Sequence, residues 1–175
     1  MTVDASWARD HIRAIENYPE PGVTFRDITP LLGDAAAFGR AVDDLVTRFH
    51  DVAVDRVVGV ESRGFILAAP VAYRLRAGFV PVRKPGRLPW AVAREEYDLE
   101  YGSDKLEIHR DAIHPEEKIL IVDDVLATGG TAAATGRLVR TLGGDIVGFG
   151  FMLEIQGLGG RARLDGRRVE SLTAY

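Results

Sequence analysis

The chain has 175 residues, of which 46% are hydrophobic and 27% are charged, and it contains no cysteine. This composition is typical of one globular domain with a full hydrophobic core, and the lack of cysteine excludes disulfides, thiolate metal sites and a cysteine nucleophile. A net charge of −4 argues against general binding to nucleic acid or to a membrane surface. Because the sequence shows neither a signal peptide nor a membrane-spanning apolar run, we expect a cytoplasmic location.

Helices and strands are expected in alternation along the chain. Apolar residues at helical spacing predict helices at residues 4–17, 35–49, 65–76 and from residue 132 onward. Short apolar runs predict strands at residues 56–60, 79–82, 119–122 and 146–153. This order predicts an α/β fold, with a central, mostly parallel sheet flanked by helices. No repeat or linker divides the chain, so residues 1–175 are expected to form a single domain.

The stretch between the second and third predicted strands is unusual. Residues 84–101 are polar, with Pro81, Pro85 and Pro89 beside or inside them, and this pattern predicts a long irregular loop that is functional or mobile. Residues 105–109 alternate like an exposed strand.

Residues 119–131, ILIVDDVLATGGT, carry most of the functional information. The pattern predicts a buried strand that ends at the adjacent carboxylates Asp123 and Asp124, then a glycine turn, then the beginning of a helix. Such a turn binds anions through unpaired backbone N–H groups and the positive end of the helix dipole. Two carboxylates beside a phosphate make sense if the ligand also offers hydroxyl groups or a divalent cation. The motif therefore predicts a site for a sugar phosphate.

Two other strand ends carry polar chemistry and should meet this motif at the same edge of the sheet. One segment is residues 59–64, which offers a single arginine, and the other is residues 83–87. The cations of these segments are Arg63, Arg83, Lys84 and Arg87. Together the three segments predict a site for two anionic groups around a polyhydroxyl centre.

Residues 123–131, DDVLATGGT, resemble the phosphoribosyl pyrophosphate signature of the type I phosphoribosyltransferases. Within that family the chain is similar to the adenine enzymes at residues 21–28 (PGVTFRDI), 61–65 (ESRGF) and 97–109 (YDLEYGSDKLEIH). The resemblance spans about residues 18–164. It implies the type I phosphoribosyltransferase-like fold, with a small N-terminal hood in about residues 1–33, a mobile catalytic loop in about residues 84–109, and a homodimer.

The resemblance also implies a reaction. The enzyme would transfer 5-phosphoribose from phosphoribosyl pyrophosphate to adenine, giving AMP and pyrophosphate with Mg²⁺, a step of purine salvage. The 5′-phosphate would be held by Ala127, Thr128, Gly129, Gly130 and Thr131. Asp123 and Asp124 would face the ribose hydroxyls, and they would bind the metal directly, through water or only through the sugar, which the sequence leaves open. The pyrophosphate would lie among Arg63, Arg83, Lys84 and Arg87.

The remaining roles concern the base and its proton. By resemblance, Phe25 would stack on adenine, with Arg26 beside it in the hood. Glu100 and Tyr101 would form the tip of the closing loop, and Glu100 would manage the proton that adenine loses. Thr24 stands where an aliphatic residue is usual in the family, and Arg87 where lysine is commoner. Residues 161–175 match the family poorly, so the sequence assigns them nothing.

Two alternatives remain open at this stage. One is a phosphoribosyltransferase for another purine, such as xanthine or hypoxanthine. The other is a non-catalytic regulator that senses ligands on the same fold, which the negative charge and the presumed catalytic loop argue against. A Rossmann dehydrogenase and a P-loop NTPase are excluded because the sequence lacks their glycine and lysine motifs.

Overall fold

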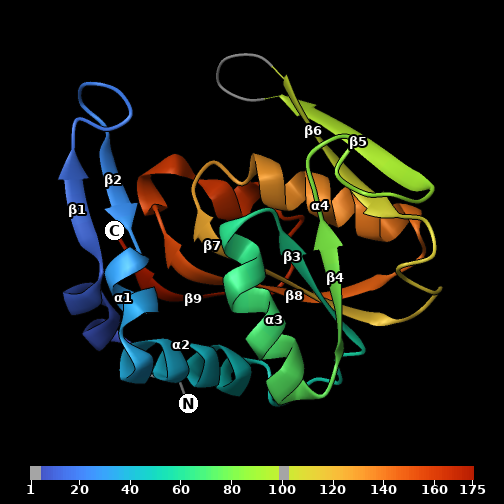
Figure 1. The fold of residues 1–175 in the computed structure, drawn as a ribbon, viewed down its shortest axis with the longest axis horizontal. Coiled ribbons are helices and arrows are strands. Elements are labelled where there is room, and N and C mark those ends of the chain that lie inside the picture. Colours follow the sequence, from blue (N-terminus) through green and yellow to red (C-terminus); the bar gives the residue numbers. More distant parts are fainter. Residues whose placement is uncertain (1–4, 99–102) are drawn as a thin grey trace.

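The computed structural model describes residues 5–98 and 103–175. Its centre is a five-stranded parallel sheet in the order β4-β3-β7-β8-β9 (Figure 1). The strands of this sheet are β3 (Arg56–Val60), β4 (Gly78–Val82), β7 (Lys118–Leu126), β8 (Asp145–Glu154) and β9 (Val169–Ala174). The predicted α/β fold with a central parallel sheet is therefore confirmed.

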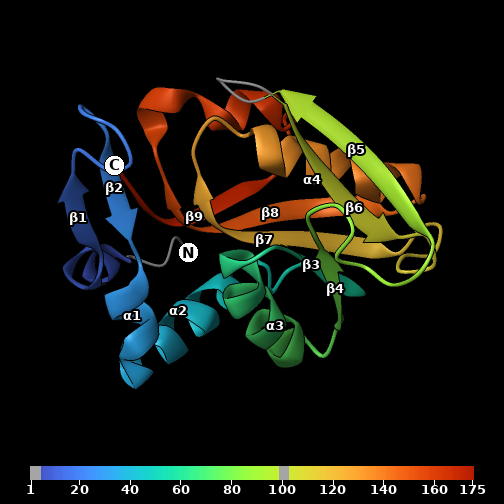
Figure 2. The same cartoon turned by 45° about the horizontal axis from the view of Figure 1, so that its top comes forward.

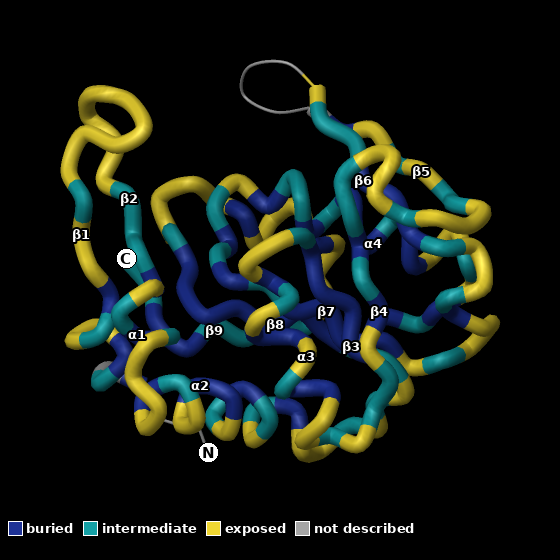
Figure 3. The backbone as a smooth tube through the Cα atoms, viewed as in Figure 1, coloured by how far each residue is buried: buried dark blue, intermediate teal, exposed yellow. Residues whose placement is uncertain are grey.

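Both faces of the sheet are covered. Helices α1 (Thr29–Gly33), α2 (Ala35–Arg48) and α3 (Arg63–Leu75) lie on one face, and α4 (Gly130–Thr141) lies on the other (Figures 1 and 2). Along β7, Leu120 and Val122 belong to the first core cluster, whereas Ile119 and Ile121 belong to the second. Because each face of this strand is buried, its sequence is continuously apolar rather than alternating. The buried part of the backbone follows these strands (Figure 3).

The predicted helices after Asp34, before Arg76 and after Thr131 are present as α2, α3 and α4. Helix α2 begins where Asp34 caps it, since the Ala37 amide donates to Asp34 Oδ1 at 2.8 Å. No helix of the described ranges 5–98 and 103–175 is long and apolar enough to cross a membrane.

The predicted N-terminal helix at residues 4–17 is wrong. A short 3₁₀ helix, η1 (Ser6–His11), is followed by strand β1 (Arg13–Glu16), which pairs antiparallel with β2 (Thr24–Asp27). The turn between them is held by Asn17, whose side-chain oxygen accepts from the Gly22 amide at 2.9 Å. The apolar spacing suited a helix, but antiparallel pairing with β2, the next strand along the chain, satisfies the backbone groups instead.

The second correction concerns residues 84–109. Residues 84–91 are irregular, as predicted, but β5 (Val92–Asp98) pairs in continuous register with β6 (Ser103–His109) to form a hairpin beside α4 (Figure 2). Strand β6 is not exposed, because Leu106 and Ile108 are fully buried against the second core cluster. The strand expected at residues 105–109 is therefore present as part of β6, whereas the adjacent charges Arg94, Glu95 and Glu96 concealed β5 from sequence reading.

The C-terminal stretch, to which the sequence assigned nothing, completes the sheet. Residues 161–175 contain the end of η3 (Gly160–Arg163), which follows η2 (Gln156–Leu158), and then β9, which pairs parallel with β8. Strand β9 is the outer strand and buries mainly Leu172 and Thr173, so its sequence is too mixed to predict a strand.

Candidate active site

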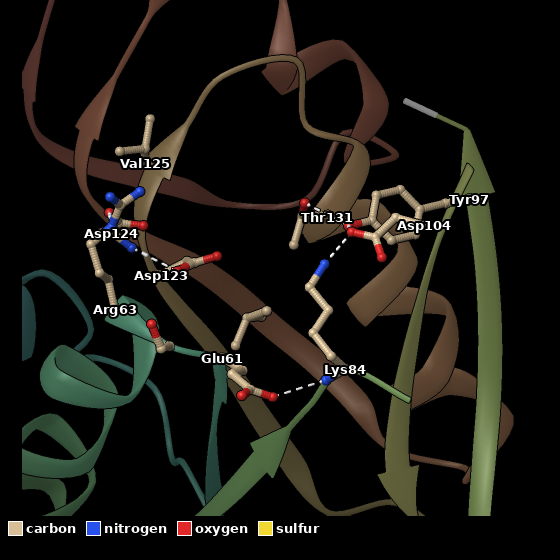
Figure 4. Close-up of a pocket in the computed structure, with 11 residues that line it drawn as sticks. Glu61, Arg63, Lys84, Tyr97, Asp104, Asp123, Asp124, Val125 and Thr131 are labelled. Carbon is tan, nitrogen blue, oxygen red and sulfur yellow. Dashed lines mark hydrogen bonds and ion pairs between the residues drawn. The ribbon is translucent and has the colours of Figure 1, made fainter. Parts of the chain in front are cut away.

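A cavity of about 430 Å³ lies where β3, β4 and β7 end (Figure 4). It is lined by Val60, Glu61, Ser62, Arg63, Lys84, Tyr97, Asp104, Asp123, Asp124, Val125 and Thr131. The three strand-end segments expected to meet do lie around this one cavity, as parallel strands require. The β5–β6 hairpin supplies an additional wall through Tyr97 and Asp104, which the sequence did not single out.

The sequence predicted that the strand ends at the acidic pair. In the structure, Asp123 and Asp124 instead lie inside β7. The strand continues to Leu126 because Val125 and Leu126 keep pairing with β8. The neighbouring strand β3, however, stops pairing at Val122. Asp123 and Asp124 are therefore held by the sheet on one side and open to the cavity on the other.

The two carboxylates differ in their surroundings. Asp123 Oδ1 accepts from the Asp124 amide at 2.9 Å, and Asp124 forms an ion pair with the Arg63 guanidinium. Burial, reinforced by the nearby Asp124 carboxylate, raises the pKa of Asp123 well above its ordinary value. A Cβ atom at Gly64 would lie 2.6 Å from Asp123 Oδ1, so this glycine allows α3 to begin directly against the acidic pair.

The loop at residues 127–131 is backed by a turn that is remote in sequence. Gly129 precedes α4 with φ +81°, a backbone conformation that favours glycine. A Cβ atom on Gly129 would lie 2.5 Å from the Gly160 carbonyl oxygen, and one on Gly160 would lie 2.3 Å from the Ala127 carbonyl oxygen. Loop and turn therefore pack backbone against backbone, with no room for a side chain between them. Nothing local in the sequence identified Gly160 as part of the site.

An ion pair fixes that turn to the sheet. The Arg161 Nε atom lies 2.8 and 2.9 Å from the two Glu154 carboxylate oxygens, and Nη2 lies 2.7 Å from Oε2. Glu154 is only 5% exposed, and the Ser171 hydroxyl also donates to it. The Arg161 guanidinium, helped by Ser171, lowers the pKa of Glu154. Because Arg161 also donates to the Val169 carbonyl oxygen, the turn is tied to both β8 and β9.

The basic cluster at the end of β4 is only partly turned toward the cavity. Arg83 binds Glu61 with nitrogen–oxygen distances of 3.2 and 3.1 Å and donates to the Arg87 carbonyl oxygen. Arg83, by its hydrogen bonds, lowers the pKa of Glu61. Lys84 alone of this cluster lines the cavity, where its ammonium pairs with Asp104. The structure thus brings Lys84 and Arg63 to the cavity, while the side chains of Arg83 and Arg87 are outside its lining.

The buried side chain of Tyr97 connects the β5–β6 hairpin to Thr131, at the beginning of α4. The Tyr97 hydroxyl lies 3.1 Å from Thr131 Oγ1 and 3.1 Å from Asp104 Oδ2, and the residue is 6% exposed. A buried phenol at a polar position needs such partners. A tyrosine and an aspartate seven residues apart, within residues 97–109, are the sequence signal for this contact.

The β1–β2 hairpin stands at the left of Figure 1, on the β9 side of the sheet. Phe25 is half-buried, and the Arg63 guanidinium lies over its ring at 5.4 Å. Arg26 instead stacks on the Tyr175 ring at 4.0 Å, and Thr24 is exposed. Phe25 is therefore connected to the cavity through Arg63, while Arg26 is turned toward the last strand. Glu100 and Tyr101 lie outside the described residues.

The cavity offers oxygen ligands without forming a closed metal cage. Within residues 5–98 and 103–175 there is no group of three or more His, Cys, Asp or Glu side chains placed to hold a metal ion. Of the cavity carboxylates, Glu61, Asp104 and Asp124 each pair with a cation, whereas no ion pair in the described part of the chain involves Asp123. Mg²⁺ commonly uses one or two carboxylates, several waters and substrate phosphates, so the residues present fit that ion.

Comparisons with known proteins agree on one family. The family profile described as the phosphoribosyl transferase domain matches residues 32–162. The adenine phosphoribosyltransferase of Desulfitobacterium hafniense is 53% identical over 165 residues, which cover 94% of this chain and 95% of that protein. The crystal structure of the adenine phosphoribosyltransferase from Thermoanaerobacter pseudethanolicus superposes with a TM-score of 0.95 at 45% identity, covering 98% and 99% of the two chains. The Saccharomyces cerevisiae enzyme, complexed with an imino-altritol bisphosphate and adenine, gives 0.92 at 37% identity, again covering 98% and 99%.

Proposed function

This chain belongs to the phosphoribosyl transferase family, and we infer from that membership that it is an adenine phosphoribosyltransferase. It transfers 5-phosphoribose from phosphoribosyl pyrophosphate to adenine, releasing AMP and pyrophosphate in purine salvage. The observation that carries this conclusion is the identity of about half of all residues with adenine enzymes, over nearly the whole of both chains. The activity predicted from the sequence is thus confirmed, in preference to another purine or to a regulator.

We place the 5′-phosphate of the substrate in the loop of residues 127–131. This placement is supported by the position of the loop before α4, where unpaired backbone N–H groups and the helix dipole favour an anion. The ribose hydroxyls then face Asp123 and Asp124, and pyrophosphate lies toward Lys84 and Arg63. Arg83 and Arg87 act from outside the cavity, where Arg83 fixes the Lys84 segment through Glu61.

The same arrangement accounts for catalysis. Breaking the bond between C1 and pyrophosphate leaves positive charge on the ribose ring and builds negative charge on the leaving group. Asp123 and Asp124 stabilise the positive charge on the ribose ring, and the cations Lys84 and Arg63 stabilise the negative charge on the leaving group. Asp123 and Asp124 would hold Mg²⁺, directly or through water, and the ion would supply positive charge that offsets the charge of pyrophosphate.

We propose that adenine stacks on Phe25, with Arg26 shaping the hood from behind through its contact with Tyr175. The contact between Arg63 and the Phe25 ring supports this placement, because it puts the base next to the pyrophosphate side of the cavity. Glu100 takes the proton from adenine, and Tyr101 closes the tip of the loop over the reactants.

We further propose that the whole chain is one domain, that it acts in the cytoplasm, and that it works as a homodimer. A single sheet with a core on each face supports the first proposal, and the cysteine-free composition supports the second. The dimer is supported by exposed apolar side chains on α3, on the outer strand β4 and after it, namely Ile66, Tyr73, Phe79 and Trp90. Sedimentation equilibrium measures the mass in solution, and a monomer at micromolar concentration would refute the dimer.

The activity is tested by incubating the protein with Mg²⁺, phosphoribosyl pyrophosphate and each purine base in turn. The expected result is AMP from adenine, with little or no nucleotide from hypoxanthine, guanine or xanthine. Faster turnover of any other base would overturn the base specificity, and no nucleotide from any base would overturn the enzyme assignment.

The catalytic role of Glu100 is tested by Glu100→Gln. Because the amide cannot accept the proton, turnover should fall roughly ten- to a thousandfold, while the affinity for phosphoribosyl pyrophosphate remains nearly unchanged. Steady-state kinetics and calorimetry separate the two effects. Normal turnover in this variant would remove Glu100 from the mechanism.

A further inference from the structure

The ammonium group of Lys84 is already occupied by a carboxylate of the protein. It reaches across the cavity from the end of β4 and pairs with Asp104 on β6 (Figure 4). Both residues line the cavity, and their side chains are 44% and 25% exposed. If pyrophosphate binds at Lys84, as proposed above, it must meet this ammonium while Asp104 is still beside it.

Asp104 itself is held in place independently of Lys84. Its Oδ2 atom accepts from the Tyr97 hydroxyl at 3.1 Å, and its Oδ1 atom accepts from the Lys105 amide at 2.8 Å. Tyr97 is buried and also contacts Thr131. The Asp104 carboxylate is therefore a fixed part of the cavity wall, which cannot follow Lys84 toward a ligand.

Asp104 is also ionised at neutral pH. Burial opposes its charge, but the Lys84 ammonium and the Lys105 amide together keep the pKa of Asp104 below its ordinary value. A fixed negative charge at this position repels a polyanionic ligand at the same time as it attracts the ammonium that the ligand needs.

Lys84, in contrast, is anchored at its backbone, and the pair with Asp104 is the interaction that holds its side chain. Its amide donates to Glu61 Oε2 at 3.0 Å, and its ammonium stands at the end of a flexible four-carbon side chain. The ammonium can therefore move between two acceptors without any displacement of the main chain.

We propose that Asp104 is a positioning residue that competes with pyrophosphate for the Lys84 ammonium. In the empty site it holds the ammonium at the wall. When pyrophosphate leaves as the product, Asp104 pairs with the ammonium again. Asp104 therefore weakens the binding of pyrophosphate and speeds its release. This inference rests on the proposed placement of pyrophosphate at Lys84.

The test is Asp104→Asn, which removes the charge but keeps the shape and an oxygen that can accept from Lys105. The affinity for magnesium pyrophosphate, measured by titration calorimetry, should increase about three- to tenfold. The product-inhibition constant of pyrophosphate should fall by the same factor, with the KM for adenine unchanged. A merely structural role would produce weaker binding, so equal or weaker affinity in the folded variant overturns the proposal.

Lys84→Met separates this inference from the placement on which it rests. The variant should bind pyrophosphate roughly tenfold more weakly than the wild type, because it loses a direct cation contact. In the Lys84→Met background, Asp104→Asn should gain much less affinity than it does alone. If Lys84→Met binds normally, the placement of pyrophosphate is wrong; if it binds weakly but Asp104→Asn gains nothing, only the competition is wrong.

Glu96→Gln is the matched control. Glu96 lies on the same hairpin and pairs with Lys105 at 3.2 Å, so the variant removes one negative charge and one lysine pair outside the pyrophosphate position. Its pyrophosphate affinity should equal that of the wild type. An increase as large as that of Asp104→Asn would mean that net charge alone is responsible, and would overturn the proposal.

Discussion

The two sides of the cavity at which we propose anion binding are built in different ways. The side at residues 127–131 rests on backbone packing, where Gly129 and Gly160 touch without side chains between them. The opposite side is held by ion pairs between partly exposed side chains, of which Lys84 with Asp104 is one. The side at residues 127–131 is a rigid backbone loop, whereas the opposite side consists of ion pairs whose cations can exchange one partner for another.

The difference matches what each side must do. The 5′-phosphate stays on the substrate throughout the reaction, so a rigid cradle can bind it in the same way before and after. Pyrophosphate must be bound tightly during bond breaking and then released, which favours cations that have a second partner within the protein. Four experiments sharpen or break this comparison.

The largest effect is expected from Gly129→Ala. An alanine at this position would have an unfavourable left-handed backbone angle, and its Cβ would overlap the Gly160 carbonyl oxygen. The loop must therefore shift. Displacement of the loop should reduce the affinity for ribose 5-phosphate about a hundredfold, as measured by calorimetry. Gly166→Ala is the control, since Gly166 has φ +66° but nothing within 4 Å of its added Cβ. Equal ligand affinities in the two variants would show that the cradle is not rigid.

Glu154→Gln tests the ion pair beneath the cradle. The variant should lose about 1–3 kcal/mol of stability at pH 7, since a buried carboxylate with several charged hydrogen bonds is replaced by a neutral amide. The pKa of Glu154 is lower in the folded state than its ordinary value of 4.5, so its contribution is present above pH 4.5 and is lost as the pH falls through the folded-state pKa. Urea unfolding at several pH values should show the difference from wild type shrinking below pH 4.5. A difference independent of pH would contradict this account.

Salt should weaken ligand binding more on one side of the cavity than on the other, with a smaller effect than the substitutions above. Raising NaCl from about 50 to about 500 mM screens exposed charges strongly but affects backbone N–H groups less. Pyrophosphate affinity should therefore fall several-fold, and ribose 5-phosphate affinity by less than half that factor. Calorimetry at the two salt concentrations measures both, and equal losses would remove the distinction between the sides.

The smallest effect is expected from Glu96→Gln in the absence of ligands. The Glu96 pair with Lys105 is exposed on both partners, and such pairs contribute little to stability. The melting temperature should change by less than about 2 °C in a calorimetric scan. A larger decrease would mean that the exposed pairs of the hairpin are structural, and not exchangeable.

Local pattern alone predicted a substantial part of this protein. The β/α alternation, the apolar strand before Asp123 and Asp124, and the glycine turn before α4 are encoded by neighbouring residues, because periodicity and turn chemistry act over a few positions. The family resemblance extended this to the activity, which the relatives confirm. The roles of Glu100 and Tyr101 remain predictions, since those residues lie outside the described ranges.

The errors have a common origin in strand pairing. The strands β1, β2, β5 and β9 were missed because each is short, or carries adjacent charges, and becomes a strand only through its pairing partner. Propensity in such segments is weaker than the backbone hydrogen bonds that tertiary structure provides. The same reason explains why Asp123 and Asp124 lie within β7 and not after it.

The sequence by itself determined which chemical groups this protein carries and which glycine turn precedes a helix, and so which turn we propose for the phosphate. Only the tertiary structure decided which residues pack beneath the turn and which residues pair with the charged groups. Gly160 lies beneath Gly129, and Asp104 faces Lys84 across the cavity, although neither pair is close in the chain. Such contacts depend on how the sheet, the hairpin and the last strand pack together, and no local pattern of residues records that packing.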